Sequence, residues 1–511
     1  MSYRNILHLL GGLLVAIALA MIPAAGVGFF EGLGPAWLLA MGIPGATGLI
    51  LWFTTPRSGE LNAREALTIV GLAWIAIVLA GSIPFMTTDV APDFAGAVFE
   101  SVSGFTTTGA TIYPVIEELP DSILLWRSLS HWIGGMGIIV LGVAILPLLG
   151  VGGAQLFFAE APGITTDRIR PRIATTARLL WGVYVGLTVA LMASYLLLGM
   201  TFFDAVNHAM SALATGGFST RTASMGYYSA PIQWVTIIFM FFAGVNFTLH
   251  YRALTGRPLA LLRNAEFKWY LLSSVLFSVV CFVVLGYTYG TWTAEVARDS
   301  IFSVVSVHST TGFGTADFAA WPVLLQSLLL ALMFVGGMGG STGGGFKMIR
   351  GAVVTQHVLG EIRKVLHPRA VIVTRVGGQP IRSDLVLKVL AFLAMYMGTH
   401  AIGTAILAAL GSDLVTALSA SLAALSSIGP GLGEVGPAGN YAGMSSAALV
   451  VLSVLMLLGR LEFYTLLVLL IPSTWTRGHR TPRPKLTAVR RKVRGWKGEA
   501  DPLSSWPPFR E

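Results

Sequence analysis

The sequence predicts an all-α polytopic membrane protein in which four pseudo-repeats surround one central pore, preceded by two N-terminal membrane helices. Each repeat is expected to consist of a helix, a short pore helix, a filter loop and a second helix. Three observations support this prediction. Long apolar runs follow one another along the chain, basic residues gather in alternate loops, and a segment rich in threonine and glycine recurs between pairs of apolar runs.

The composition is that of a membrane protein. Of the 511 residues, 54% are hydrophobic and 11% are charged, whereas soluble domains carry about 25% charged residues. Several apolar runs exceed the roughly 18 residues that suggest a bilayer-spanning helix. The first run, residues 6–30, is followed almost at once by another at 35–53. We therefore expect the first run to be a retained membrane helix and not a cleaved signal.

The basic residues indicate how the chain is threaded through the membrane. The net charge of +9 comes from 33 Lys and Arg against 24 Asp and Glu. A nucleic-acid-binding protein would carry them on a folded aqueous face, but here they lie in short loops between apolar runs and in the tail. This distribution follows the positive-inside rule, places both termini in the cytoplasm and gives about ten spans. The expected spans are residues 6–30, 35–53, 66–85, 123–149, 181–200, 232–249, 269–289, 322–349, 385–410 and 445–472.

Four polar segments remain on the outer side, each between an outgoing and a returning helix. They end in FTTTGAT, LATGGFST, HSTTGFGT and SSIGPGLG, and they align on Gly109, Gly216, Gly312 and Gly429. Each is too short to span a bilayer. Four copies at a period of roughly 100 residues indicate a repeated architecture.

The chemistry of these segments favours a cation pathway. Irregular backbone at membrane depth is tolerated where it is buried or lines a watery cavity, and glycine allows the positive φ angles that let successive carbonyls point the same way. Four such loops around one axis would form rings of carbonyl oxygens that replace the hydration shell of a cation. The C-terminal end of each preceding short helix would add a favourable negative potential.

The predicted organisation has six parts. Residues 1–60 form the two extra helices, and the four pore repeats follow at 61–175, 176–265, 266–383 and 384–475. Residues 476–511 form a basic cytoplasmic tail, for which contact with anionic lipid, binding to a cytosolic ring and simple disorder all stay open.

Residues 1–476 resemble the Trk/Ktr/HKT superfamily of potassium transporters, and most closely its bacterial TrkH type. The resemblance rests on FTTTGAT, HWIGGMGIIVLGVAILPLLGVGG, GGMGGSTGGGFKMIR, GPGLG, GRLEFYTLLVLL and the four filter loops. It implies a homodimer in the bacterial inner membrane and a partner, a cytosolic nucleotide-binding ring of the TrkA type. The transported ion would be K⁺, with no other cofactor in this chain.

The resemblance also implies which residues bind K⁺. They are Thr107, Thr108 and Gly109; Ala214, Thr215 and Gly216; Thr310, Thr311 and Gly312; and Ser427, Ile428 and Gly429. Within the family, serine in place of the first glycine accompanies sodium transport, so Gly109 favours potassium. The fourth loop departs from the Thr-Gly pattern at Ile428 and Pro430, which makes the ring asymmetric.

A dense glycine run, residues 335–345, should break the returning helix of the third repeat, because glycine costs about 1 kcal/mol relative to alanine inside a helix. In the family an intramembrane gating loop lies here, and close helix packing is the alternative. The gating candidates in and beside the run are Gly336, Gly337, Gly339, Gly340, Gly343, Gly344, Gly345 and Lys347.

Arg460 lies well inside the last apolar run. Intramembrane charges are costly and usually functional, and the family has an arginine at this place, so we expect Arg460 to repel cations near the cavity. Pairing with an acid is the alternative. Glu462 is two residues further on and would therefore point to another face of the helix.

These observations predict gated potassium uptake. A Na⁺- or H⁺-coupled K⁺ symporter and a weakly selective K⁺/Na⁺ permease remain open, because coupling and selectivity are kinetic properties. A membrane-embedded enzyme is a remote alternative, since the sequence lacks a constellation such as HExxH or GxSxG.

Overall fold

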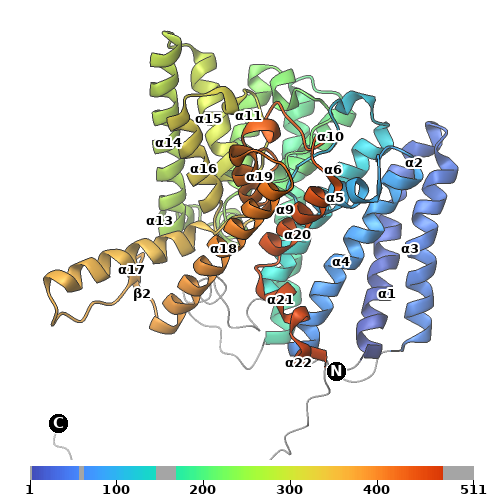
Figure 1. The fold of residues 1–511 in the computed structure, drawn as a ribbon, viewed down its shortest axis with the longest axis horizontal. Helices are drawn as coiled ribbons and strands as arrows, with labels where there is room; N and C mark the ends of the chain where they lie inside the picture. The colour runs from blue at the N-terminus through green and yellow to red at the C-terminus, as the bar shows by residue number, and fades with distance from the viewer. Residues whose placement is uncertain (1–2, 57–62, 145–168, 476–511) are drawn as a thin grey trace, which may run out of the picture.

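The computed structural model describes residues 3–56, 63–144 and 169–475, and this part of the chain is almost entirely helical. Figure 1 shows two neighbouring helices at one edge of the molecule and a larger helical body beside them. The basic tail, residues 476–511, lies outside the described residues.

The edge helices are α1 (Tyr3–Ala20), continued by α2 (Ile22–Phe30), and α3 (Gly34–Thr54). Two glycines bring α1 and α3 together. A Cβ atom on Gly11 would lie 2.7 Å from the carbonyl oxygen of Gly48, and the reverse distance is also 2.7 Å. Small residues permit this close helix packing in membranes.

The body contains four units with the same order of elements, which confirms the predicted fold class. The outgoing helices are α4 (Ala63–Thr87), α9 (Ile169–Leu197), α14 (Ala265–Tyr289) and α18 (Ser383–Ala409). The pore helices are α5 (Phe94–Phe105), α10 (Phe202–Leu213), α15 (Ala294–His308) and α19 (Leu414–Ser426). The returning segments are α6 (Asp121–Ala144), α11 (Ala230–Ala243) with α12 (Phe247–Leu254), α16 (Val323–Val335) with α17 (Met348–Leu366), and α20 (Ser446–Arg460) with α21 (Tyr464–Leu470).

Short elements complete the described chain. They are α13 (Leu259–Arg263), α22 (Pro472–Trp475), a two-stranded antiparallel ribbon of β1 (Arg375–Val376) and β2 (Gln379–Pro380), and the 3-10 turns η1 (Ile116–Glu118), η3 (Ser224–Tyr227), η4 (Phe318–Ala320) and η5 (Gly433–Val435).

Each pore helix begins at a residue whose side chain caps it. Asp93, Thr201, Thr293 and Asp413 accept hydrogen bonds from backbone N–H groups in the first turn of α5, α10, α15 and α19. Such caps satisfy N–H groups that have no partner within the helix. The Asp93 carboxylate also accepts a hydrogen bond of 2.6 Å from Ser446 at the start of α20, which holds the pKa of Asp93 below its ordinary value.

Three of the four returning segments are interrupted, so they do not form continuous spans. Within the described residues, six helices are long and apolar enough to cross a membrane, or seven if α11 and α12, which meet at 104°, count as one bent span. Residues 336–347 separate α16 from α17, and α20 ends at Arg460 before a turn with positive φ at Glu462 and Phe463. The spans predicted at 232–249, 322–349 and 445–472 were therefore too continuous, whereas α6 is one helix up to Ala144 and residues 145–149 of its predicted span lie outside the described residues.

Candidate ion filter and gate

The four loops that follow the pore helices share one backbone conformation. Thr107, Thr215, Thr310 and Ser427 have left-handed φ angles of 54°, 56°, 63° and 54°. The N–H of the next residue in each loop donates back to the pore helix: from Thr108 to Ser103, Gly216 to Ser211, Thr311 to Ser306 and Ile428 to Ala423, over 2.8–2.9 Å. A left-handed conformation in threonine or serine is unfavourable, so its recurrence at four equivalent positions points to function.

This backbone register corrects the alignment of the second repeat. Alignment of the four repeats in the sequence paired Gly216 with Gly109, but Gly217 is the residue whose backbone conformation matches that of Gly109. Its φ is 82°, as at Gly109, and Gly312 has 83°. The second loop therefore contributes Thr215, Gly216 and Gly217, while Ala214 is the C-cap of α10. Because LATGGFST contains two adjacent glycines, the sequence alone does not show which of them corresponds to Gly109. The position at which α10 ends identifies it as Gly217.

Glycine is required because the loops close on one another. A Cβ atom on Gly109 would lie 1.9 Å from the Gly216 oxygen, and one on Gly217 would lie 2.2 Å from the Thr311 oxygen. The third and fourth loops meet where a Gly312 Cβ would lie 3.0 Å from the Gly429 nitrogen. The fourth loop returns to the first, since a Gly429 Cβ would lie 2.7 Å from the Gly109 oxygen. The four loops thus form a closed ring in chain order.

Side chains of the pore helices hold the loops in this shape. Ser103 donates to the carbonyl of Ala110 over 2.6 Å, and the equivalent Ser306 donates to Phe313 over the same distance. The hydroxyls of Thr106 and Thr108 are 2.8 Å apart, and those of Ser309 and Thr311 are 2.7 Å apart. Repeats 1 and 3 therefore use the same bonds, whereas the fourth has Ala423 where the serine would be.

A buried ion pair supports the first loop from behind. Arg127 on α6 donates to Glu100 on α5 over 2.7 Å, and both side chains are at most 2% exposed. Glu100 also accepts hydrogen bonds from the Thr111 hydroxyl and the Ile112 N–H. The chain beyond the second and third loops is held by Thr220, which donates to Asp204, and by Thr315, which donates to Asp299.

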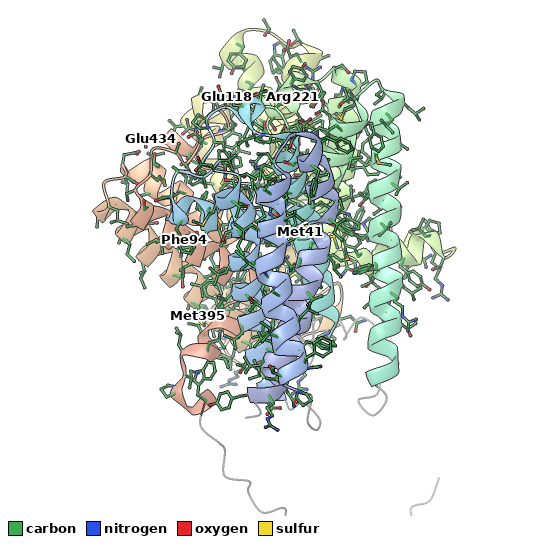
Figure 2. The ribbon with its side chains drawn as sticks, turned by 90° about the vertical axis from the view of Figure 1, so that its right-hand side faces the viewer. Met41, Phe94, Glu118, Arg221, Met395 and Glu434 are labelled. Carbon is green, nitrogen blue, oxygen red and sulfur yellow. The ribbon has the colours of Figure 1, made fainter. Side chains whose placement is uncertain are left out.

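A cavity of about 90 Å³ opens above the ring. Its floor includes Gly109, Gly217, Gly312 and Gly429, and Arg127 and Arg221 contribute to its walls. Figure 2 shows Arg221 and Glu118 at one end of the molecule. Arg221 is paired with Asp204 over 3.1 Å, so its positive charge is partly compensated.

The loop of residues 336–347, called the glycine-rich loop, packs against the other side of the ring. The Gly344 N–H donates to the Thr310 hydroxyl over 2.7 Å, and a Cβ on Gly344 would lie 2.0 Å from the Ser426 oxygen. Thr342 donates to the Leu213 carbonyl at the end of α10 over 3.0 Å. The loop therefore contacts the ends of three pore helices, and the expected break of the third returning helix is observed at this place.

Two basic side chains lie at this loop. Arg460 is 3% exposed and donates through Nη1 to the Thr342 carbonyl over 2.8 Å. Lys347 donates to the Gly343 carbonyl within the loop. Glu462 does not pair with Arg460. It accepts from Arg350 on α17 over 2.7 Å, which agrees with the expectation that the two residues point to different faces.

Sequence reasoning missed two anchors of the glycine-rich loop. Asn246 donates to the Gly339 carbonyl over 2.8 Å and also caps α12. Glu266 accepts from the N–H groups of Gly339 and Ile349, over 2.7 and 3.1 Å, and so joins the beginning of the loop to the helix after it. An asparagine before a helix is a recognisable cap, but the second contact of each residue depends on the tertiary fold.

Comparison with known proteins identifies the architecture. The chain matches the family model described as TrkH, a cation transport protein, over residues 40–476. The Trk system potassium uptake protein TrkH of Vibrio parahaemolyticus serotype O3:K6 is 41% identical over 486 residues, covering 93% of this chain and 100% of that protein. The TrkH protein of Escherichia coli strain K12 is 39% identical over 485 residues, with the same coverage.

A solved structure shows the same fold. The crystal structure of the potassium transporter TrkH from Vibrio parahaemolyticus superimposes with a TM-score of 0.86 at 39% sequence identity, covering 93% of this chain and 100% of that one. The relatives are named as uptake proteins and not as enzymes, in agreement with the expectation from sequence. The chain is an integral membrane protein and belongs to the TrkH family of cation transport proteins.

Proposed function

We propose that this protein takes up potassium across the bacterial inner membrane through the ring of four filter loops, with both termini in the cytoplasm. The observation that carries the proposal is the closed ring in which three loops share left-handed threonine followed two residues later by glycine at a φ of 82–83°. The similar proteins named as potassium uptake proteins support the choice of ion.

Backbone carbonyls of Thr107, Thr108 and Gly109 and of their counterparts would bind K⁺. The counterparts are Thr215, Gly216 and Gly217; Thr310, Thr311 and Gly312; and Ser427, Ile428 and Gly429. Two side chains at the inner end of the ring fit the same role. The hydroxyl oxygens of Thr107 and Ser427 are buried and have no hydrogen-bond partner among the described residues. Oxygen atoms left without partners in a buried site are suited to replace the water around a cation.

The glycine-rich loop would be a closed gate beneath this ring. Its glycines, with Gly336, Gly340 and Gly345 at positive φ, allow the chain to pass close to the ends of the pore helices. Arg460 and Lys347 would add positive charge beneath the filter, which opposes the passage of cations. Asn246 and Glu266 would fix the loop in its closed position.

Opening would come from the cytoplasmic side. α17 follows the glycine-rich loop directly and projects from the helical body in Figure 1. A pull on α17 by a cytosolic nucleotide-binding ring of the TrkA type would therefore act on the loop. The proposed partners are this ring, a second copy of the chain in a homodimer, and membrane lipids. The Trk system to which the relatives are assigned by name supports a regulatory partner.

The test is cation flux into liposomes that contain the purified protein, measured with K⁺, Rb⁺, Na⁺ and Li⁺ and repeated with a pH gradient. Preferred flux of K⁺ and Rb⁺ without a second gradient is the expected result. Equal flux of K⁺ and Na⁺ would instead assign a weakly selective permease, which the asymmetric fourth loop would explain. Flux of K⁺ that needs a Na⁺ or pH gradient would assign a symporter.

A further inference from the structure

Tyr441 connects the fourth filter loop to the first repeat. Its hydroxyl donates a hydrogen bond of 2.9 Å to the carbonyl of Gly429, and its backbone N–H donates to the carbonyl of Thr111 over 2.9 Å. The side chain is 3% exposed, and its ring lies 5.3 Å from that of Phe99 on α5. The backbone hydrogen bond to Thr111 and the ring contact with Phe99 therefore hold the Tyr441 hydroxyl against the Gly429 carbonyl.

The fourth loop lacks the support that holds two of the others. Ser103 and Ser306 bind the carbonyl of the residue after the filter glycine in repeats 1 and 3. Ala423 occupies this position in repeat 4 and has no hydroxyl. Gly429 also lacks the positive φ of Gly109, Gly217 and Gly312. The fourth loop thus has a different backbone, and Tyr441 donates the hydrogen bond that its Gly429 carbonyl accepts.

We propose that Tyr441 is the positioning residue of the fourth filter loop and that its hydrogen bond to Gly429 sets the preference of the filter for K⁺ over Na⁺. This inference rests on the proposed function, because it assumes that ions pass through the ring. A carbonyl tethered by a buried hydroxyl resists rotation toward a small ion, whereas an untethered carbonyl follows the ion. Na⁺ gains from such movement because it is smaller and needs closer oxygen ligands than K⁺.

The experiment compares wild type, Tyr441→Phe and the control Tyr113→Phe in the liposome assay. Tyr113 lies in the same outer cavity, and its buried hydroxyl has no hydrogen-bond partner among the described residues. Tyr441→Phe should lower the ratio of K⁺ flux to Na⁺ flux by about fivefold, the size expected from one net hydrogen bond. K⁺ flux itself should stay within about twofold, and Tyr113→Phe should keep the wild-type ratio.

A second readout does not depend on flux. The melting temperature in detergent is measured in KCl and in NaCl, since an ion that binds the folded protein raises it. Wild type and Tyr113→Phe should be stabilised more by K⁺ than by Na⁺, and Tyr441→Phe should lose most of this difference. A variant that is merely misfolded would melt early in both salts.

The outcomes separate the inference from the proposed function. A selective wild type with an unchanged ratio in Tyr441→Phe would overturn the role of Tyr441 and leave the filter proposal standing. An equal loss of selectivity in Tyr113→Phe would also overturn it, because the effect would then come from the cavity as a whole. A wild type that does not distinguish K⁺ from Na⁺ would overturn both.

Discussion

Substitution of the two glycines in the second filter loop tests the ring directly. Gly217→Ala should be severe and Gly216→Ala milder. Gly217 has a φ of 82°, where alanine costs about 1–2 kcal/mol. Its Cβ would also lie 2.2 Å from the Thr311 carbonyl oxygen. Because unstrained contacts need well over 3 Å, the neighbouring filter backbone would have to move by about 1 Å.

Gly216 is a matched control in the same loop. Its Cβ would lie 2.1 Å from the ring of the buried His131, so this side chain would have to move, but the backbone of the neighbouring loops would not, and Gly216 does not have a positive φ. We expect Gly217→Ala to reduce K⁺ flux at least tenfold, because a filter carbonyl displaced by about 1 Å loses its place in the ring. Gly216→Ala should retain more flux.

The assay is Rb⁺ or K⁺ flux into liposomes at matched protein content, with gel filtration to confirm that each variant is folded. Equal loss of flux in the two variants would mean that an added methyl group at either position disrupts the loop. A larger loss in Gly216→Ala would refute the register that the backbone angles define, and it would restore the alignment of Gly216 with Gly109.

Three further predictions concern the gate and the support of the filter. Deletion of residues 339–344 should raise K⁺ flux in the absence of any partner, and unchanged flux would contradict the gating role. Arg460→Ala should also raise K⁺ conductance, because it removes a buried positive charge that lies against the glycine-rich loop; unaltered conductance would favour a structural role. Arg127→Met leaves the buried Glu100 without its ion partner and should cost about 3–5 kcal/mol of unfolding free energy. Lys364→Ala, which breaks an exposed pair, should leave the melting temperature unchanged; equal effects of these two substitutions would refute the importance of burial.

The sequence was sufficient to predict the repeated architecture because its signals are local. Each pore helix is followed by a threonine- or serine-containing segment, and this pattern lies within one stretch of chain. The break after Val335 follows in the same way from the density of glycine. Such features need no knowledge of which segments meet in space.

What the sequence could not supply were the contacts between repeats. The separate partners of Arg460 and Glu462, which are Thr342 and Arg350, lie more than a hundred residues away along the chain. The register of the second loop failed for a related reason. Spacing between repeats varies, so the backbone angles and the hydrogen bonds to the end of α10 are needed to distinguish Gly216 from Gly217.

A hydrogen bond at Thr310 joins the ring to the glycine-rich loop, and this limits how independently the two can act. The backbone of Thr310 forms part of the ring, while its hydroxyl accepts the N–H of Gly344. The hydroxyls of Thr107 and Ser427, at equivalent positions, have no hydrogen-bond partner among the described residues. Withdrawal of the glycine-rich loop would break this hydrogen bond. The Thr310 hydroxyl would then lack a partner, like the hydroxyls of Thr107 and Ser427, and would offer one more oxygen ligand at the inner end of the ring. An open gate should thus bind K⁺ more tightly at this end, and a K⁺-dependent shift in melting temperature should be larger in the 339–344 deletion than in the intact chain.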